Sequence, residues 1–233
     1  MTARRPLILA HRGAHTVHRE NSLEAFSAAF DAEADGIECD VQKSPRGDYV
    51  IVHDPPATTK NGFKSERPGP VSLEAMLESL PFGAFLNLEL KSDTLTAADC
   101  GPIFEALGRR PASGGLLISS FEPALLPYFK ARGVQIGLLI GEEAAKTGMA
   151  RMARQIFRLK PDYLNMPILM FEVLGTRRGL LLASLSRALG FSLAFWTVNR
   201  EEELRLVKKL ARIIITDDVH TVRTALHLRP GER

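Results

Sequence analysis

The feature of this sequence that most restricts its fold is a regular alternation of short apolar runs with longer segments of helical pattern. The apolar runs have the length and composition of buried strands, and the segments between them repeat apolar residues every three or four positions. Strands are expected at 7–12, 36–42, 85–91, 115–121, 135–141, 162–167, 192–198 and 212–218, with 48–54 as a hairpin arm of the second. Helices are expected at 22–33, 72–80, 98–110, 123–132, 143–159, 173–189, 200–210 and 219–227.

Eight strands alternating with eight helices are the repeat of an α/β fold of the (β/α)₈ TIM-barrel type. The chain of 233 residues is close to the usual size of such a barrel, so we expect one domain over residues 1–233. A doubly wound open sheet is the alternative, because alternation alone does not show that the sheet closes. No Gly-rich nucleotide-binding motif follows a strand, which weakens the nucleotide-binding form of that alternative.

Charge and cysteine content argue against several classes of protein. The net charge of +3 comes from scattered Lys and Arg residues without a basic block, so a nucleic-acid partner is not expected. Cys39 and Cys100 are too few for a disulfide framework. The first apolar run is too short for a signal peptide, and no segment approaches the roughly 18 apolar residues of a membrane span. We therefore expect a cytoplasmic protein without stable membrane insertion.

Polar residues gather at the carboxyl ends of the first three expected strands, where barrel enzymes carry their active sites. Side chains alternate across a strand, so the polar residues of each strand share one face and the intervening apolar residues share the other. The apolar face belongs under the helices, which turns the polar face into the barrel. The residues concerned are His11 and Arg12 in the first strand, Glu38 and Asp40 in the second, and Asn87, Glu89 and Lys91 in the third.

Three carboxylates converging inside a barrel need a compensating charge, because unpaired buried charges are very costly. A hard divalent cation such as Mg²⁺, Ca²⁺ or Mn²⁺ would supply it, since all-oxygen ligation suits these ions better than Zn²⁺. Each group alone has a plainer interpretation. Lys91 could be a counter-ion for Glu89, and His53 could be a core histidine.

Five motifs follow one another along the chain: "HRG" at 11–13, "RENSLEAF" at 19–26, "GIECDVQ" at 36–42, "VIVHD" at 50–54 and "LNLELK" at 86–91. Together they resemble the glycerophosphodiester phosphodiesterase family. Their order, spacing and strand context match the pattern of that family, and the later segments "ISSF", "FWTVN" and "IITDD" extend the similarity over nearly the whole chain. The resemblance implies a TIM barrel of the phospholipase C-like phosphodiesterase type. It also implies hydrolysis of glycerophosphodiesters to sn-glycerol 3-phosphate and an alcohol, with one divalent cation, Mg²⁺ or Ca²⁺.

The resemblance further implies a role for each matching residue. Histidines that titrate near neutrality suit proton transfer, and cationic side chains suit a phosphate whose oxygens gain charge during displacement. Which histidine is the acid, and whether a cyclic phosphate forms, is left open. The implied roles are acid and base catalysis for His11 and His53, metal binding for Glu38, Asp40 and Glu89, phosphate binding for Arg12 and Lys91, the substrate pocket for Trp196 and Phe121, and support of the first loop for Glu20 and Asn21.

Some of these assignments have alternatives in the sequence. Asn21 is equally suited to cap the helix that follows it, and Phe121 and Trp196 could belong to the core. His15 and His18 are interpreted as loop residues without a catalytic role. A zinc site formed by His11 and His15 is not favoured, because the metalloprotease spacing requires a helix and His11 ends a strand.

The chain departs from the family pattern in two places. Arg19 stands where the family usually has Pro, and Ser22 where it has Thr. A shortened insertion at about 55–72 should leave the mouth of the site more open, which affects substrate choice more than reaction type.

Other activities on the same barrel remain open. A lysophospholipase D or a sphingomyelinase D-like phosphodiesterase should display an exposed apolar rim or an interfacial helix. The segment "GLLLASLSRALGFSLAF" at 179–195 is the most apolar candidate, but its pattern fits a barrel helix and strand. A non-catalytic scaffold should lack at least one of the five implied catalytic and metal-binding residues, and all five are present. The expected partner is a small-molecule substrate, and the sequence does not predict an oligomeric state.

Overall fold

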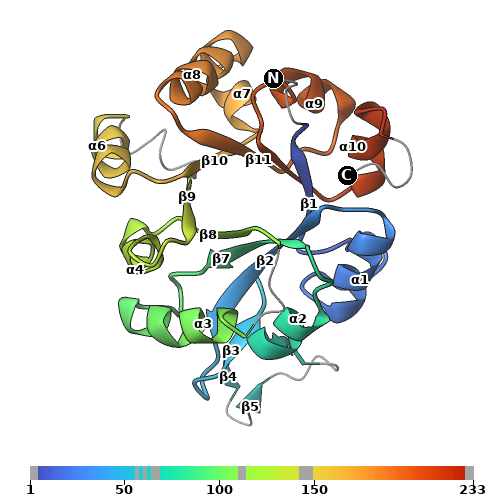
Figure 1. Ribbon diagram of the computed structural model, residues 1–233, viewed down its shortest axis with the longest axis vertical. Helices are drawn as coiled ribbons and strands as arrows, with labels where there is room; N and C mark the ends of the chain where they lie inside the picture. The colour runs from blue at the N-terminus through green and yellow to red at the C-terminus, as the bar shows by residue number, and fades with distance from the viewer. Residues whose placement is uncertain are drawn as a thin grey trace.

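Eight parallel strands form a closed barrel in the computed structural model, which describes residues 5–55, 58–59, 62–63, 69–109, 114–141 and 149–228 (Figure 1). Each strand pairs with the next barrel strand along the chain, and the last pairs with the first, with Leu7 opposite Ile213. The predicted (β/α)₈ barrel is therefore confirmed, and the open-sheet alternative was wrong. The barrel strands are β1 (Leu7–His11), β2 (Gly36–Lys43), β7 (Phe85–Leu90), β8 (Leu116–Ser120), β9 (Gln135–Leu139), β10 (Tyr163–Pro167), β11 (Ser192–Trp196) and β12 (Ile213–Thr216).

Short strands extend the barrel beside β2. β3 (Tyr49–Ile51) is antiparallel to β2, as the hairpin pattern predicted, and β6 (Val71–Ser72) is antiparallel to β3. β4 (Thr58–Thr59) and β5 (Gly62–Phe63) form a separate antiparallel pair. The shortened insertion predicted at about 55–72 lies in this region, and its residues 56–57, 60–61 and 64–68 are outside the described part of the chain.

Helices surround the barrel and follow its strands in turn (Figure 1). The helix expected at 173–189 begins only at Thr176, because Gly175 has a φ of +79° that does not continue a helix. The helix expected at 143–159 is described only from residue 149. No helix among the described residues is long and apolar enough to cross a membrane. The helical segments are α1 (Leu23–Asp31), α2 (Leu73–Ser79), η1 (Ala97–Asp99), α3 (Cys100–Leu107), η2 (Pro123–Leu125), α4 (Pro127–Lys130), α6 (Met149–Leu159), α7 (Met170–Val173), α8 (Thr176–Ala188), α9 (Glu201–Val207) and α10 (Val219–Ala225).

The alternation of side chains divides the packing of the barrel as the sequence predicted. On β7, Leu86, Leu88 and Leu90 are fully buried in the large cluster beneath the helices. The inward face of the same strand begins with Phe85, which belongs to a smaller apolar cluster with Leu9, Leu117, Tyr163, Ala194, Ile213 and Ile215. Asn87 and Glu89 follow on that inward face toward the carboxyl end. An apolar layer thus fills the amino end of the barrel interior, and a polar layer lies above it.

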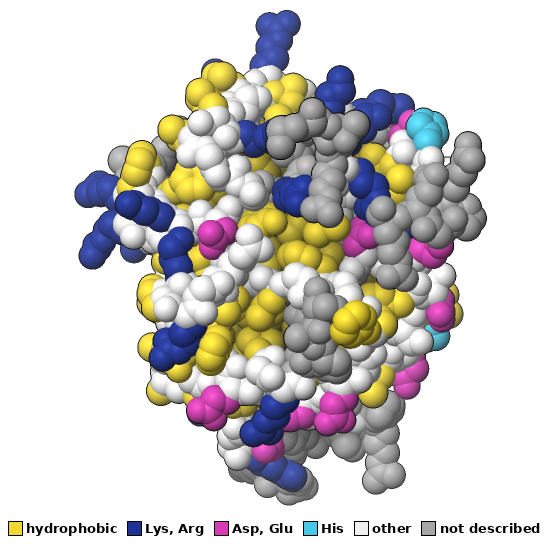
Figure 2. Space-filling model, in the orientation of Figure 1, with side chains coloured by type: hydrophobic (Ala, Val, Ile, Leu, Met, Phe, Trp, Pro, Cys, Tyr) yellow, Lys and Arg dark blue, Asp and Glu magenta, His cyan; other side chains and the backbone are white. Residues whose placement is uncertain are grey.

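Hydrophobic and basic side chains occupy different parts of the outer surface. In the orientation of Figure 1, hydrophobic side chains occupy much of the centre of the face shown in Figure 2. Lys and Arg side chains gather at its left and upper margins. These margins correspond to the positions of α6 and α8 in Figure 1.

Gly36 should be one of the positions where the barrel tolerates no side chain. Gly36 in β2 pairs with Phe85 in β7, and a Cβ placed on Gly36 would lie 2.0 Å from the Phe85 carbonyl oxygen. Because backbone must move to relieve that clash, Gly36→Ala should lower the free energy of unfolding by at least about 1–3 kcal/mol. Gly69→Ala is the matched control, since a Cβ there meets nothing within 4 Å. Equal stability of the two variants in denaturant titrations would contradict this account of the β2–β7 contact.

Candidate active site

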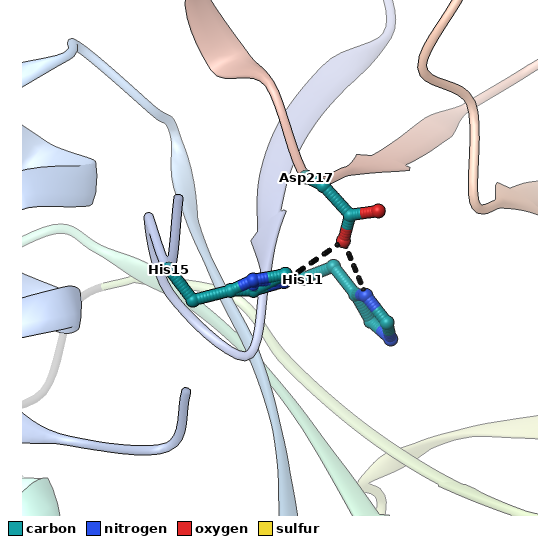
Figure 3. Close-up of side chains that lie close together, drawn as sticks. All are labelled: His11, His15 and Asp217. Carbon is teal, nitrogen blue, oxygen red and sulfur yellow. Dashed lines mark hydrogen bonds and ion pairs between the residues drawn. The ribbon is translucent and has the colours of Figure 1, made fainter. Parts of the chain in front are cut away.

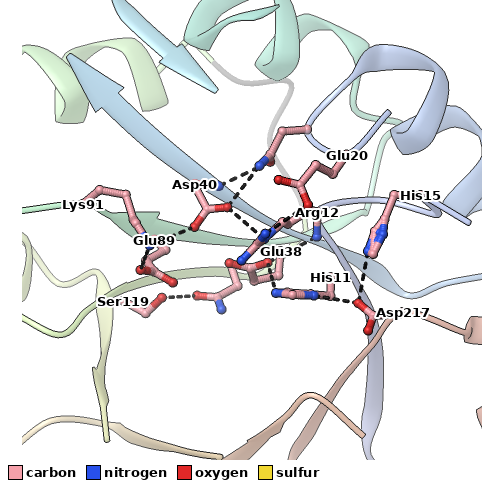
Figure 4. A network of polar contacts seen from close by, with 12 residues as sticks. His11, Arg12, His15, Glu20, Glu38, Asp40, Glu89, Lys91, Ser119 and Asp217 are labelled. Carbon is pink, nitrogen blue, oxygen red and sulfur yellow. Dashed lines mark hydrogen bonds and ion pairs between the residues drawn. The ribbon is translucent and has the colours of Figure 1, made fainter. Parts of the chain in front are cut away.

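Three carboxylates meet inside the carboxyl end of the barrel (Figure 4). Glu38 and Asp40 come from β2 and Glu89 from β7, and the strand register places Asp40 directly opposite Glu89. All three residues are buried, and one carboxylate oxygen from each lies within 4.8 Å of the others. The convergence predicted from strand alternation is therefore present.

Arg12 and Lys91 point at the same carboxylates. Nε of Arg12 lies 3.3 Å from Oδ2 of Asp40, and its Nη1 donates to Oε2 of Glu20 at 3.0 Å. Nζ of Lys91 lies 3.0 Å from Oε1 of Glu89 and 3.6 Å from Oδ1 of Asp40. The two cations thus bracket the acidic cluster and partly offset its charge.

The turn after β1 brings the first loop back onto the site. Arg12 has a φ of +54° and Gly13 a φ of +83°, and a Cβ on Gly13 would lie 2.7 Å from the backbone of Ala25. Ser22 caps α1 by accepting from the Ala25 N–H, so Asn21 is not the cap. Asn21 instead donates from Nδ2 to Oδ2 of Asp40 at 3.0 Å. The loop therefore supports the acidic cluster directly.

Burial and mutual repulsion change the titration of two of these carboxyls. Burial, and then the charges of Asp40 and Glu89, raise the pKa of Glu38 well above its usual range. Burial and Asp40 raise the pKa of Glu89 to about 7, although Lys91 and Arg12 oppose the shift. Arg12 and Lys91 therefore do not cancel the effect of burial and repulsion on the pKa values of Glu38 and Glu89.

The donor set fits a hard divalent cation. It consists of buried carboxylate oxygens only, and these lie close enough to share one ion. Burial, together with mutual repulsion, raises the pKa values of Glu38 and Glu89. An ion bound there would offset the repulsion that Arg12 and Lys91 leave. This cluster could therefore bind a metal ion.

His11 is held by Asp217, which lies in the segment "IITDD" and has no predicted role. Oδ1 of Asp217 lies 2.7 Å from Nδ1 of His11 and 3.2 Å from Nε2 of His15 (Figure 3). Asn199 fixes Asp217 from both sides, because its Nδ2 donates to Oδ2 at 2.6 Å and its Oδ1 accepts from the Asp217 N–H at 2.9 Å. Nε2 of His11 faces the acidic cluster, 4.0 Å from Oε2 of Glu38. Asp217 comes directly after β12, so its place at a strand end was a signal available in the sequence.

His15 lies closer to the site than its interpretation as an ordinary loop residue suggested. Its ring contacts that of His11 edge to face, with 6.0 Å between the centroids. The contact with Asp217 makes His15 part of the same polar network (Figure 4).

His53 lies just beyond β3 and reaches the site region through the backbone. The Val52 N–H donates to the Asp40 carbonyl at 2.9 Å, and Nε2 of Gln42 donates to the His53 carbonyl at 2.6 Å. The imidazole Nδ1 lies 2.8 Å from Oδ1 of Asp54, an exposed residue. His53 is thus next to the strand end that carries Asp40, and its imidazole is held by Asp54.

Phe121 and Trp196 form a pair at the ends of β8 and β11. Their rings meet edge to face with 5.9 Å between centroids, and Trp196 donates from Nε1 to the Asn165 carbonyl at 3.2 Å. Phe121 is 43% exposed, which excludes a purely structural core position for its ring. The two predicted pocket residues are therefore brought together at the rim.

Three comparisons with known proteins agree with this architecture. The model of the glycerophosphoryl diester phosphodiesterase family matches residues 11–67. A glycerophosphodiester phosphodiesterase of Caldanaerobacter subterraneus is 28% identical over 246 residues, which cover 93% of this chain and 96% of that protein. The crystal structure of a glycerophosphodiester phosphodiesterase from Thermotoga maritima is 26% identical, with a TM-score of 0.76 and coverage of 93% and 96%.

A further solved structure supports the fold at lower identity. A phosphodiesterase from Oleispira antarctica, solved in complex with the product sn-glycerol-3-phosphate, has a TM-score of 0.79 at 22% identity. The match covers 96% of this chain and 97% of that chain.

Closed parallel barrels carry their chemistry at the carboxyl ends of their strands, and the groups gathered at that end here are suited to a phosphodiester. The class that this fold and this site define is therefore a barrel phosphoric diester hydrolase. Within that class, the chain is similar to the glycerophosphodiester phosphodiesterase family model over residues 11–67 and to glycerophosphodiester phosphodiesterases over nearly its whole length.

The metal-free protein should lose stability as the pH rises through the titration of the acidic cluster. Because Glu38 and Glu89 have folded-state pKa values above the ordinary 4.5, the folded protein binds more protons than the unfolded chain between about pH 4.5 and about pH 7. The free energy of unfolding of the metal-free protein therefore falls as the pH rises from about 4.5 to about 7. A divalent cation competes with those protons, so Mg²⁺ or Ca²⁺ should raise the Tm more at about pH 8 than at about pH 5. Thermal unfolding with and without chelator measures both effects.

Two glutamine variants separate the cluster from the rest of the surface. Glu89→Gln should reduce both the pH dependence and the cation effect, whereas Glu24→Gln, on the exposed side of α1, should leave both unchanged. A cation effect of the same size at both pH values in the unmodified protein would contradict the assignment of the ion to these carboxylates.

Proposed function

We propose that this enzyme hydrolyses glycerophosphodiesters to sn-glycerol 3-phosphate and an alcohol, with the help of one divalent cation. The observation that carries the proposal is the convergence of three buried carboxylates, two cationic side chains and an oriented histidine at the carboxyl end of the barrel. The similarity of the chain to glycerophosphodiester phosphodiesterases and the product bound in the Oleispira antarctica protein support the choice of substrate.

The cationic side chains would bind the phosphate. Arg12 and Lys91 both reach the edge of the acidic cluster, so an anionic phosphodiester entering there would meet a guanidinium and an ammonium. The nearby carboxylates raise the pKa of both groups despite the opposing effect of burial, so both stay charged at neutral pH. Fixed positive charge stabilises the phosphate oxygens as they gain charge during displacement.

His11 and His53 would share the acid and base steps. The Asp217 carboxylate accepts from Nδ1 of His11, which leaves Nε2 on the side of Glu38 and the substrate. One histidine would take a proton from the attacking oxygen, and the other would give one to the leaving alcohol oxygen. Asp217, itself held by Asn199, would keep the His11 ring in place for this transfer.

Glu38, Asp40 and Glu89 would hold Mg²⁺ or Ca²⁺, whose charge would add to that of Arg12 and Lys91 in stabilising the phosphate. We further propose that residues 1–233 form one domain with a shortened insertion at about 55–72. The cytoplasmic location expected from the sequence stays a prediction.

A lysophospholipid is a second candidate substrate, and one observation favours it. Leu169 and Val173, between β10 and α8, are 37% and 60% exposed, and the adjoining Ile168 N–H donates to the carbonyl of Trp196. Together with Phe121, these residues give the rim an apolar side that could hold a hydrocarbon chain. The substrate panel below distinguishes the two candidates.

The purified protein should hydrolyse glycerophosphocholine and release sn-glycerol 3-phosphate in a reaction that EDTA abolishes and Mg²⁺ or Ca²⁺ restores. The physical reason is that the carboxylate cluster needs an added positive charge before an anionic diester can bind beside it. Enzymatic assay of the released glycerol phosphate measures the rate, with lysophosphatidylcholine tested in parallel. Turnover that chelation does not change would contradict the metal assignment, and preference for the lysophospholipid would favour the second candidate.

Removal of either proposed catalytic histidine should lower kcat by roughly 10² to 10⁴, the usual effect of losing a general acid or base. The variants are His11→Ala and His53→Ala, and His18→Ala is the control because its side chain is exposed in the same loop as His15. Steady-state rates and circular dichroism spectra together separate lost catalysis from lost folding. A variant with an unchanged kcat would show that its histidine has neither role.

A further inference from the structure

α8 presents a row of leucines to solvent on the outside of the barrel. Leu181 and Leu185 are 60% and 53% exposed, and Leu189, directly after the helix, is 67% exposed. The three residues lie four positions apart, so they form one strip along the helix. The opposite side of α8 is buried through small residues, Gly179 and Ala183. Packing of the barrel therefore does not account for the leucine strip.

The same part of the chain holds the surplus positive charge of the protein. Residues 149–190 contain seven Lys and Arg against two Asp and Glu, whereas the rest of the chain contains 23 against 25. Arg177 and Arg178 are exposed in the first turn of α8, where a helix dipole disfavours cations, so they do not serve the helix. Arg151 and Arg158 are exposed on α6. Figure 2 shows the resulting basic and apolar margin where Figure 1 places α6 and α8.

We propose that this surface, the α8 face, docks the enzyme on an anionic phospholipid bilayer. The α8 face comprises Arg177, Arg178, Leu181, Leu185 and Leu189, with the arginines of α6 beside them. Leucines on an interfacial helix enter the boundary between headgroups and acyl chains, and arginines contact the lipid phosphates. The association is peripheral, because the helix has a buried side that stays packed on the barrel.

Other partners would interact favourably with either the arginines or the leucines of the α8 face, but not with both. A nucleic acid would pair with the arginines but would gain little from the leucines. A second copy of the chain would cover the leucines, but it would place another segment with net positive charge against the first and offer no negative charge to the arginines. An anionic bilayer offers negative charge and an apolar layer together, which is the combination that the α8 face matches.

The direction of α8 relates the α8 face to the active site. The helix follows β10, so its first turn lies at the carboxyl end of the barrel, where the carboxylate cluster is. Leu169 and Val173 extend the exposed apolar surface from α8 toward that end. Docking through the α8 face would therefore hold the mouth of the site beside the lipid surface.

Vesicle flotation with the full chain tests the proposal. The protein should float with phosphatidylcholine vesicles that contain about a third phosphatidylglycerol, stay unbound with pure phosphatidylcholine, and bind less as salt is raised. The double variant Arg177→Gln with Arg178→Gln should lower the partition coefficient roughly tenfold in total, because each lost charge weakens binding to the anionic lipid several-fold. Leu181→Ser with Leu185→Ser and Leu189→Ser should lower it at least as much.

Matched controls come from other exposed positions. Phe82→Ser removes an apolar side chain that is 75% exposed, and Arg46→Gln with Arg132→Gln removes two charges; both should bind like the unmodified protein. Circular dichroism should show that all variants are folded. Equal binding to both kinds of vesicle, no binding to either, or full binding by the leucine variant would overturn the proposal. So would a dimer, seen by sedimentation, that the leucine substitutions dissociate.

Discussion

Electrostatic repulsion among Glu38, Asp40 and Glu89 is the constraint on which the rest of the site depends. Asp40 and Glu89 lie opposite each other on two adjacent parallel strands, and Glu38 lies two residues before Asp40 on the same inward face. Burial removes all three carboxylates from water. Arg12, Lys91 and Asn21 each contact Asp40, which is the most enclosed of the three acids. The raised pKa values of the two glutamates show that this support is incomplete, and an anionic substrate needs a further cation beside it.

Closure of the barrel brings His11 and Asp217 together. β1 pairs with β12, so His11 and Asp217 meet although 206 positions separate them in the chain. Asn199, which follows β11, fixes the Asp217 carboxylate through two hydrogen bonds. The orientation of His11 therefore depends on strands from both ends of the sequence, while the acidic cluster depends on neighbouring strands near its start.

The outer surface of α8 carries exposed leucines that packing against the barrel does not require. A barrel helix needs apolar residues on one side only, and α8 meets that need with small side chains. Its leucines fit a helical pattern, which is why segment 179–195 was interpreted as an ordinary barrel helix and strand. Periodicity shows that a residue is apolar and in phase with a helix, but the side of the helix that faces the barrel is set by packing.

The sequence by itself determined the alternation of strands and helices, the inward direction of Glu38, Asp40 and Glu89, and the family resemblance, because all three follow from residue periodicity and local motifs. Closure of the sheet into a barrel was decided by the pairing of β1 with β12. It also located Arg12 and Lys91 at strand ends. Only the tertiary structure decided that Ser22 and not Asn21 caps α1, that His15 joins the site, and that Asp217 holds His11. Asn21 is not the cap because its side chain reaches Asp40 on β2. The contacts of Asp217 with His11 and His15 depend on which strand ends become neighbours when the sheet closes, and local sequence patterns carry no information about contacts between segments so far apart.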